Sequence, residues 1–234
     1  NYLNMEQVFN RSCKKDGEPL TCAPTLFDAE LDRLYRNRGD GTFEDATDRF
    51  GFTDPKGKGL GVVGLHVEGR PGLQLFVAND TTENQYFESV ATERQGPMYA
   101  ENAMLAGLAM SESGNIQACM GVAAGDADGN GSIDLFVTNF YADSNTMYLQ
   151  TAPGMFIDSS RACALAEPSY GMLGFGTQFL DADLDGHLDL IITNGHVDQT
   201  FATGEPDRMP PQFFLNSGQG NFVELKDSLP GSFF

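Results

Sequence analysis

Two short acidic segments hold the residues of this chain that are best suited to chemistry. They read Asp126-Ala-Asp128-Gly-Asn130-Gly-Ser132-Ile-Asp134 and Asp181-Ala-Asp183-Leu-Asp185-Gly-His187-Leu-Asp189. Both place oxygen-bearing side chains at loop positions 1, 3, 5 and 9 and a glycine at position 6. Ca²⁺ takes six to eight oxygen ligands at about 2.3–2.6 Å. The spacing therefore predicts one calcium site in each segment.

The remaining loop positions fit the same interpretation. Ser132 and His187, at position 7, would supply a backbone carbonyl, and Gly131 and Gly186 would allow the tight turn. Magnesium keeps more of its waters in a stricter octahedron, and zinc prefers His or Cys ligands, so calcium is the expected ion. We expect the second loop, with four aspartates, to bind more tightly than the first, with three. The alternative is an exposed acidic turn without a metal.

A third segment occupies the same place in the repeat but has lost the ligands. Its corresponding residues are His66, Glu68, Arg70, Pro71 and Gln74. Arg70 stands where a carboxylate would be needed, so we expect no ion here. The two acidic loops also differ from an EF-hand, because position 12 is Val137 or Ile192 within an apolar run instead of a glutamate that leads into a helix.

An internal repeat positions these loops. The segments Gly61–Asn79, Gly121–Asn139 and Gly176–Asn194 share one frame and begin 60 and then 55 residues apart. Each ends in a short apolar run and an asparagine, which is typical of a buried strand. Repeats of this length indicate a chain built from similar supersecondary units.

A second module alternates with the first and predicts a β-hairpin. Its copies are Leu34–Asn37 with Gly39–Phe43, Met147–Gln150 with Gly154–Phe156, and Phe213–Asn216 with Gly218–Phe222. One full unit then has about four strands in 55 to 60 residues, which favours an all-β fold of β-propeller blades over a β-helix or a sandwich. We expect a half blade at 34–58 and whole blades at 59–115, 116–170 and 171–234, about three and a half in all, after an N-terminal extension at 1–33.

The composition of the chain argues against nucleic-acid binding and against membrane insertion. The formal charge is −19 in 234 residues, with no basic cluster to contact nucleic acid, and no stretch approaches the roughly 18–20 apolar residues of a membrane span. Cys13 and Cys22 bracket a short loop that would close as a disulfide in an oxidising compartment, the alternative being two free thiols in a cytosolic protein. We expect neither nucleic-acid binding nor direct membrane insertion.

Taken with their order, these segments resemble a known repeat. The Asp-x-Asp-x-Asp/Asn-Gly-x-x-Asp frame followed by an apolar strand and Asn is similar to the FG-GAP/VCBS repeat. The chain more closely resembles the cartilage acidic protein 1 family (ASPIC/UnbV-associated). This resemblance rests on the order and spacing of Leu34–Asn37, Gly61–Val63, Val77–Asp80, Met120–Val122, Val137–Phe140 and Thr193–Val197. The resemblance implies a secreted or periplasmic calcium-binding propeller, usually of seven blades, and does not imply an enzyme.

Two features depart from that family. Cys119 and Cys163 stand where the family tends to carry small residues, so they form either a second disulfide or two separately buried thiols. Three and a half units also cannot close a ring of seven blades. We therefore expect either that this is a segment of a longer protein or that another chain covers its open edges.

The expected function is that of a protein-binding scaffold or an accessory subunit of an extracytoplasmic assembly, whose partner is a protein or further propeller blades. The alternatives are a carbohydrate-active enzyme resembling a polysaccharide lyase and a lectin-like propeller that binds glycans. No catalytic constellation is recognisable in the sequence, so we expect no enzyme activity.

Overall fold

The computed structural model describes residues 2–15, 17–52, 57–90, 98–197 and 207–226. Within them the fold is all-β, with three four-stranded antiparallel sheets, two small two-stranded sheets and few helices. In each four-stranded sheet every strand pairs with the next one along the chain, so the connections are hairpins without crossovers.

The three large sheets follow one another along the chain. The first contains β5 (Gly59–Leu65), β6 (Gln74–Asn79), β7 (Gln85–Val90) and β8 (Met98–Glu101). The second contains β9 (Cys119–Gly125), β10 (Asp134–Asn139), β11 (Thr146–Ala152) and β12 (Met155–Asp158). The third contains β13 (Gly174–Leu180), β14 (Asp189–Asn194), β15 (Gln212–Asn216) and β16 (Phe222–Glu224).

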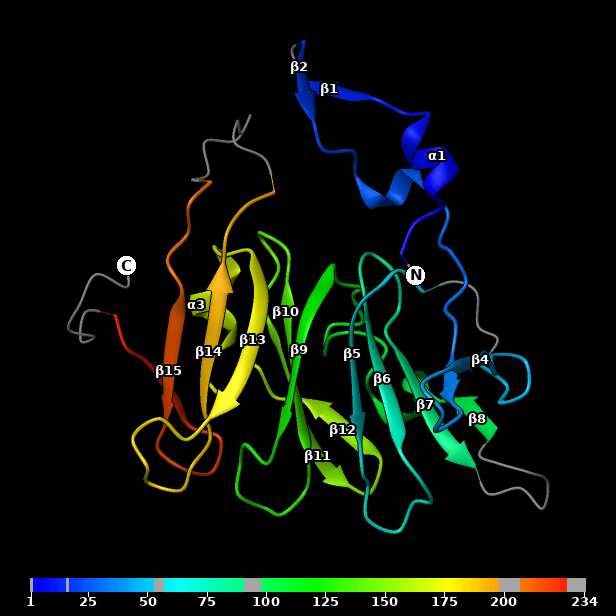
Figure 1. Ribbon diagram of the computed structural model, residues 1–234. Coiled ribbons are helices and arrows are strands. Elements are labelled where there is room, and N and C mark those ends of the chain that lie inside the picture. The colour runs from blue at the N-terminus through cyan, green and yellow to red at the C-terminus, as the bar shows by residue number, and fades with distance from the viewer. Residues whose placement is uncertain (1, 16, 53–56, 91–97, 198–206, 227–234) are drawn as a thin grey trace.

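The sheets are arranged side by side through their first strands. Strand β9 contacts both β5 and β13, and Figure 1 shows these three strands next to one another in the middle of the molecule. The apolar faces between the sheets hold the core: Phe76 lies 6.4 Å from Tyr148 and Phe136 lies 6.5 Å from Phe179, measured between ring centroids. None of the described sheets closes on itself.

Glycines at the start of the repeat let neighbouring sheets approach closely. A Cβ atom added to Gly61 would lie 2.5 Å from the carbonyl oxygen of Met120, and one added to Gly121 would lie 1.9 Å from that of Phe175. At Gly61 and Gly121, the first two glycines of the repeat frame, a side chain would push neighbouring sheets apart, whereas a Cβ at the third, Gly176, would meet only Thr193 of its own sheet.

The half unit before the first large sheet consists of β3 (Tyr35–Asn37) and β4 (Phe43–Asp45), which pair only with each other among the described residues. Two short helices, α2 (Ala103–Ala106) and α3 (Ala166–Tyr170), connect the large sheets. Among the described residues no helix is long and apolar enough to cross a membrane.

The N-terminal extension carries the predicted disulfide. It comprises α1 (Met5–Phe9), the hairpin of β1 (Cys13–Lys15) and β2 (Glu18–Leu20), and a 3₁₀ turn at Pro24–Leu26. A disulfide joins Cys13 to Cys22, which confirms the first cysteine pairing. The extension lies above the sheets in Figure 1.

Cys119 and Cys163 do not form a second disulfide. Both are free thiols, buried in two different apolar clusters between the sheets. Burial raises the pKa of the Cys119 thiol to about 12 and that of Cys163 to about 11. Of the two alternatives, separately buried thiols are therefore correct, and neither thiol is activated for chemistry.

Candidate metal centres

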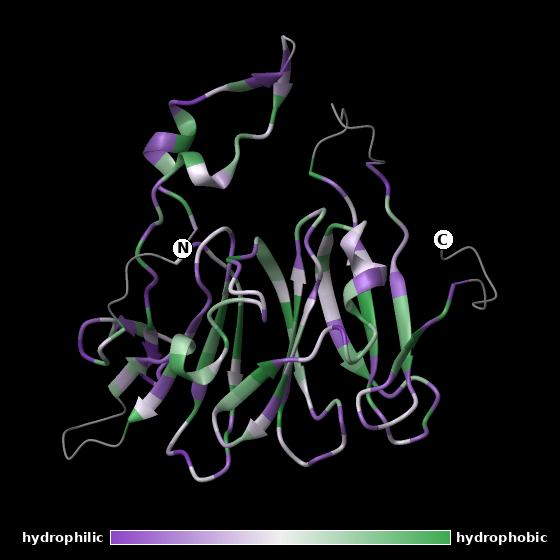
Figure 2. Cartoon of the chain, turned by 180° about the vertical axis from the view of Figure 1, so that it is seen from behind, coloured by the Kyte–Doolittle hydropathy of each residue, from purple (hydrophilic) through white to green (hydrophobic). Residues whose placement is uncertain are grey.

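The two acidic loops connect the first and second strands of successive sheets. Asp126 follows the last residue of β9, and Asp134 is the first residue of β10, opposite Gly125 in the ladder. In the next sheet Asp181 follows β13, and Asp189 begins β14 opposite Leu180. The strand pairing thus fixes both ends of each loop. The loops lie at the same lower edge of the sheets in Figure 1, which the back view in Figure 2 colours as largely hydrophilic.

Three carboxylates converge in each loop. One side-chain oxygen from each of Asp126, Asp128 and Asp134 lies within 4.8 Å of the others, and Asp181, Asp183 and Asp189 form the corresponding cluster. These are loop positions 1, 3 and 9 of the predicted ligand sets. Three like charges this close repel one another unless a cation neutralises them.

The position 5 residues take a different role in this structure. The Oδ1 atoms of Asn130 and Asp185 accept hydrogen bonds from the backbone N–H groups of Ser132 (2.7 Å) and His187 (2.8 Å). Asp185 is not part of the carboxylate cluster, so three of the four aspartates of the second loop converge. The His187 imidazole lies beside Gly218, where an added Cβ would be 3.1 Å from Nε2. The His187 side chain is therefore not expected to be a ligand.

Backbone N–H groups hold the position 1 carboxylates. Gly131 donates to Asp126 Oδ2 at 2.9 Å, and Gly186 donates to Asp181 Oδ2 at 3.1 Å. Both glycines have positive φ angles, 86° and 91°, which side chains rarely adopt. The glycine at position 6 is thus required by the turn that directs its N–H at the first aspartate.

The position 9 carboxylates tie each loop to the third strand of its sheet. Asp134 accepts hydrogen bonds from the N–H groups of Ala127 (2.9 Å) and Gln150 (2.8 Å). Asp189 accepts from Ala182 and from Asn216, both at 2.9 Å. Burial raises the pKa of Asp134 to about 6, against the opposing effect of these backbone donors and with a further upward contribution from Asp128.

One carboxylate oxygen of the first loop lacks a hydrogen-bond partner in the part of the chain that the structure describes. Asp126 Oδ1 is buried and has no hydrogen-bond partner among the described residues. A buried anionic oxygen without a partner is costly, and a bound cation would remove that cost. The available donors are all carboxylate, amide or carbonyl oxygens, which suit Ca²⁺ better than Zn²⁺.

The third loop closes without converging carboxylates. Gln74 occupies position 9, and its Oε1 accepts from the N–H of Ser89 at 2.7 Å, the same contact that Asp134 and Asp189 make in their sheets. Its Nε2 donates to the carbonyls of Pro71 (2.9 Å) and Gly72 (3.3 Å). The amide thus supplies hydrogen-bond donors to the loop carbonyls from inside the loop. Arg70 lies 3.6 Å from Glu88, its salt-bridge partner.

Asn216 connects the two acidic loops across the sheet boundary. Its Nδ2 donates to the carbonyl of Ala127 in the first loop at 2.7 Å and to that of Leu188 in the second loop at 3.0 Å. Its backbone N–H holds Asp189. The sequence placed Asn216 only in a hairpin, so this bridging role was missed, and no pattern along the chain signals it.

The comparison with family models finds a known repeat in this part of the chain. An FG-GAP-like repeat matches residues 126–192, which contain both acidic loops and the strands between them. A search of curated proteins finds no match to the chain.

Proposed function

We propose that this chain is a calcium-stabilised β-propeller segment that acts as a protein-binding scaffold or accessory subunit of an extracytoplasmic assembly. The observation that carries the proposal is a pair of equivalent loops in each of which three aspartates converge. In the first loop one carboxylate oxygen of Asp126 is also buried without a hydrogen-bond partner in the described part of the chain. A divalent cation bound by oxygen ligands satisfies both features.

Calcium would act on stability and shape. Asp126, Asp128 and Asp134 would hold one ion and Asp181, Asp183 and Asp189 the other, with Asn130, Asp185 and the carbonyls of Ser132 and His187 as further oxygen donors. Because the ligands come from both ends of each loop, binding would lock β9 to β10 and β13 to β14. A ligand that binds only the folded state stabilises it in proportion to the logarithm of its concentration.

The propeller architecture is supported by the contacts between sheets. Each large sheet has four antiparallel strands in chain order, and the first strands pack in a row through Gly61 and Gly121. Radial repetition of such sheets is the propeller arrangement. The resemblance to the cartilage acidic protein 1 family favours the same architecture and a scaffold role. The Cys13–Cys22 disulfide and the lack of a membrane-spanning helix among the described residues are compatible with an extracytoplasmic address.

The test compares thermal unfolding with and without calcium. At a free calcium concentration 100 times the dissociation constant, each site would contribute about 2.7 kcal/mol. For a chain of this size, two such sites would raise the midpoint temperature by roughly 10–20 °C. We expect this rise to disappear on adding a chelator, and to disappear in the double variant Asp128→Ala with Asp183→Ala.

Glu68→Ala is the matched control, because Glu68 occupies position 3 of the third loop, and it should retain the full rise. A midpoint unaffected by chelator in the parent chain would refute the calcium scaffold. Calcium-dependent cleavage or binding in a glycan screen would favour the carbohydrate-directed alternatives instead.

A further inference from the structure

The β3–β4 hairpin has the same internal structure as the outer hairpins of the complete sheets. Asn37 pairs with Phe43, as Gln150 pairs with Phe156 and Asn216 with Phe222. The turn is also shared, since Gly39 N–H donates to Asn37 Oδ1 at 2.8 Å and Gly218 N–H donates to Asn216 Oδ1 at 3.0 Å.

The agreement continues beyond the hairpin. Ala46 N–H donates to the carbonyl of Leu34 at 2.8 Å, and Leu34 N–H donates to Thr47 Oγ1 at 3.0 Å. The corresponding bonds in the second large sheet run from Ser159 to Met147 at 2.7 Å and from Met147 to Ser160 Oγ at 2.9 Å. The two outer strands of a sheet are thus fully formed at residues 34–47.

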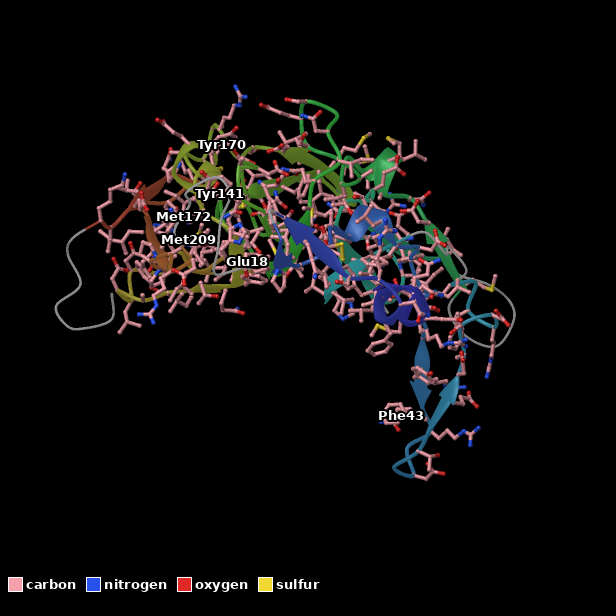
Figure 3. The ribbon with its side chains drawn as sticks, turned by 90° about the horizontal axis from the view of Figure 1, so that it is seen from above. Glu18, Phe43, Tyr141, Tyr170, Met172 and Met209 are labelled. Carbon is pink, nitrogen blue, oxygen red and sulfur yellow. A yellow bond between two sulfur atoms is a disulfide. The ribbon has the colours of Figure 1, made fainter. Side chains whose placement is uncertain are left out.

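The surroundings of the hairpin are different. Strand β11 pairs with β10 on its other edge and β15 pairs with β14, whereas β3 has no partner but β4 among the described residues. Tyr35 is 57% exposed, while Tyr148 and Phe214, the equivalent residues, are fully buried. Phe43 is 61% exposed, against 3% for Phe156 and for Phe222. Figure 3 shows the hairpin with Phe43 extending away from the rest of the molecule. The positions that the complete sheets bury are therefore open to solvent here.

The complete sheets also show which groups would bind to the open edge of β3. The backbone N–H of Gln150 binds Asp134 and that of Asn216 binds Asp189, the last aspartate of each acidic loop. The Asn216 and Gln150 side-chain amides donate to the residue before that aspartate, Leu188 or Ile133. Asn37 has the same register and the same turn contact, so its N–H and its Nδ2 are placed to bind an equivalent loop.

The next residue of the missing strand follows from the same register. Leu135 faces Tyr148, and Leu190 faces Phe214, and both leucines are fully buried. The residue that covers Tyr35 should thus be apolar and should directly follow an aspartate. Burying Tyr35 and Phe43 would remove a large apolar area from water.

We propose that the β3–β4 hairpin is a docking edge for a two-stranded antiparallel element whose connecting loop ends in Asp followed by an apolar residue, as in the two acidic loops described here. The element completes a fourth four-stranded sheet and brings a third calcium loop with it. This inference rests on the proposed function, because it assumes that the chain is part of a propeller.

A second copy of this chain does not fit as the occupant. Its two acidic loops end in Asp134 and Asp189, and each of these aspartates is already bound by the third strand of its own sheet. The third loop ends in Gln74, which is likewise engaged with Ser89. The occupant is therefore a polypeptide segment of the same repeat type that lies outside the described residues.

The test adds the missing half as a peptide. A synthetic peptide with the sequence of residues 174–194, which forms β13, the acidic loop and β14 in its own sheet, is titrated into the full chain in excess calcium. Amide exchange and chemical shifts are followed at residues 34–47. We expect saturable changes confined to this segment, with new protection of the Asn37 N–H.

The variant Asn37→Asp keeps the side-chain oxygen that holds the turn but replaces the Nδ2 donor with a negative charge. It should weaken peptide binding at least about tenfold, the effect of losing one hydrogen bond to a charged or buried acceptor. Arg38→Ala, at the exposed end of the same hairpin, is the matched control and should bind like the parent.

A second experiment, with the peptide fused to the chain, covers the case in which the free peptide does not fold. The same sequence is joined to the C-terminus through about 40 Gly/Ser residues, which span roughly 35 Å and raise the effective concentration to the millimolar range. Absence of protection at residues 35–37 in both experiments overturns the proposal, as does equal binding by Asn37→Asp. Concentration-dependent protection without any peptide would identify a second copy as the occupant and would also overturn it.

Calcium uptake by the two acidic loops is measured separately on the chain without peptide. A failed docking test with intact calcium uptake therefore leaves the proposed calcium scaffold standing. Loss of calcium uptake would refute the scaffold itself.

Discussion

Replacing Gly121 with alanine tests the packing that places the acidic loops in a row. An alanine Cβ would lie 1.9 Å from the carbonyl oxygen of Phe175 and 3.0 Å from Thr138 Oγ1. Thr138 Oγ1 also bridges the sheets, because it accepts from Gly121 N–H and donates to the Phe175 carbonyl, both at 2.8 Å. Since the obstructing atom belongs to the backbone of β13, no side-chain rotation relieves the clash.

The expected cost follows from the displacement. Real Cβ contacts are essentially never shorter than 3.0 Å, so β9 or β13 must move by about 1 Å. Overpacking of this kind costs typically about 1–3 kcal/mol, and a backbone obstruction places Gly121→Ala at the upper end. At 3 kcal/mol the midpoint temperature of a chain this size would fall by roughly 6–12 °C.

The assay is urea and thermal unfolding in the presence of calcium, with Gly195→Ala as the matched control. A Cβ at Gly195 meets nothing within 4 Å, so that variant should change the free energy of unfolding by less than about 0.5 kcal/mol. Gly176→Ala, whose Cβ would meet only Thr193 Oγ1 at 2.9 Å, should fall between the two. Equal stability of Gly121→Ala and Gly195→Ala would refute the proposed contact between sheets.

Three further outcomes are expected. Gln74→Glu should lower the free energy of unfolding by about 1–3 kcal/mol, because it removes the donor to two loop carbonyls. The number of bound calcium ions should stay the same, and an additional ion would contradict this account of the third loop. Reducing Cys13–Cys22 should destabilise the N-terminal extension by about 2–3 kcal/mol and speed its proteolysis without altering calcium uptake, which calorimetry would check. Cys119 and Cys163, whose pKa values are raised to about 12 and 11, should stay protonated and resist iodoacetamide at pH 9 until urea unfolds the chain; rapid native labelling would contradict their burial.

Local spacing predicted most of the fold. The two acidic loops, the strands that flank them and the three hairpins all lie within short segments that recur in register, so the sequence shows them directly. The Cys13–Cys22 disulfide closes a short loop and was equally local. These features depend on neighbours along the chain and not on distant contacts.

The outer strands of the first large sheet were not assigned from the sequence. Strands β7 and β8 lack the Gly-rich turn that marks the other hairpins. A weaker signal was present, since Asn84 Oδ1 accepts from Asn79 N–H at 2.9 Å just as Asn145 Oδ1 accepts from Asn139 N–H at 2.8 Å. The spacing of the paired asparagines differs by one residue between the two units, which conceals the similarity in an alignment.

Other features depended on contacts between units and were not predictable. The bridge that Asn216 makes between the two acidic loops joins residues 89 positions apart. The separate burial of Cys119 and Cys163 follows from the packing of different sheet pairs. Asp185 lies outside the carboxylate cluster, and its side chain accepts a hydrogen bond from the backbone N–H of His187. The residue types of the loop do not determine this choice of partner.

Counting bound calcium ions tests the central claim most directly. Native mass spectrometry and calorimetric titration would be applied to the parent chain, to Asp128→Ala, to Asp183→Ala and to the control Glu68→Ala. We expect two ions for the parent and the control, and one ion for each loop variant. A parent chain that binds no calcium, or loop variants that keep both ions, would contradict the account.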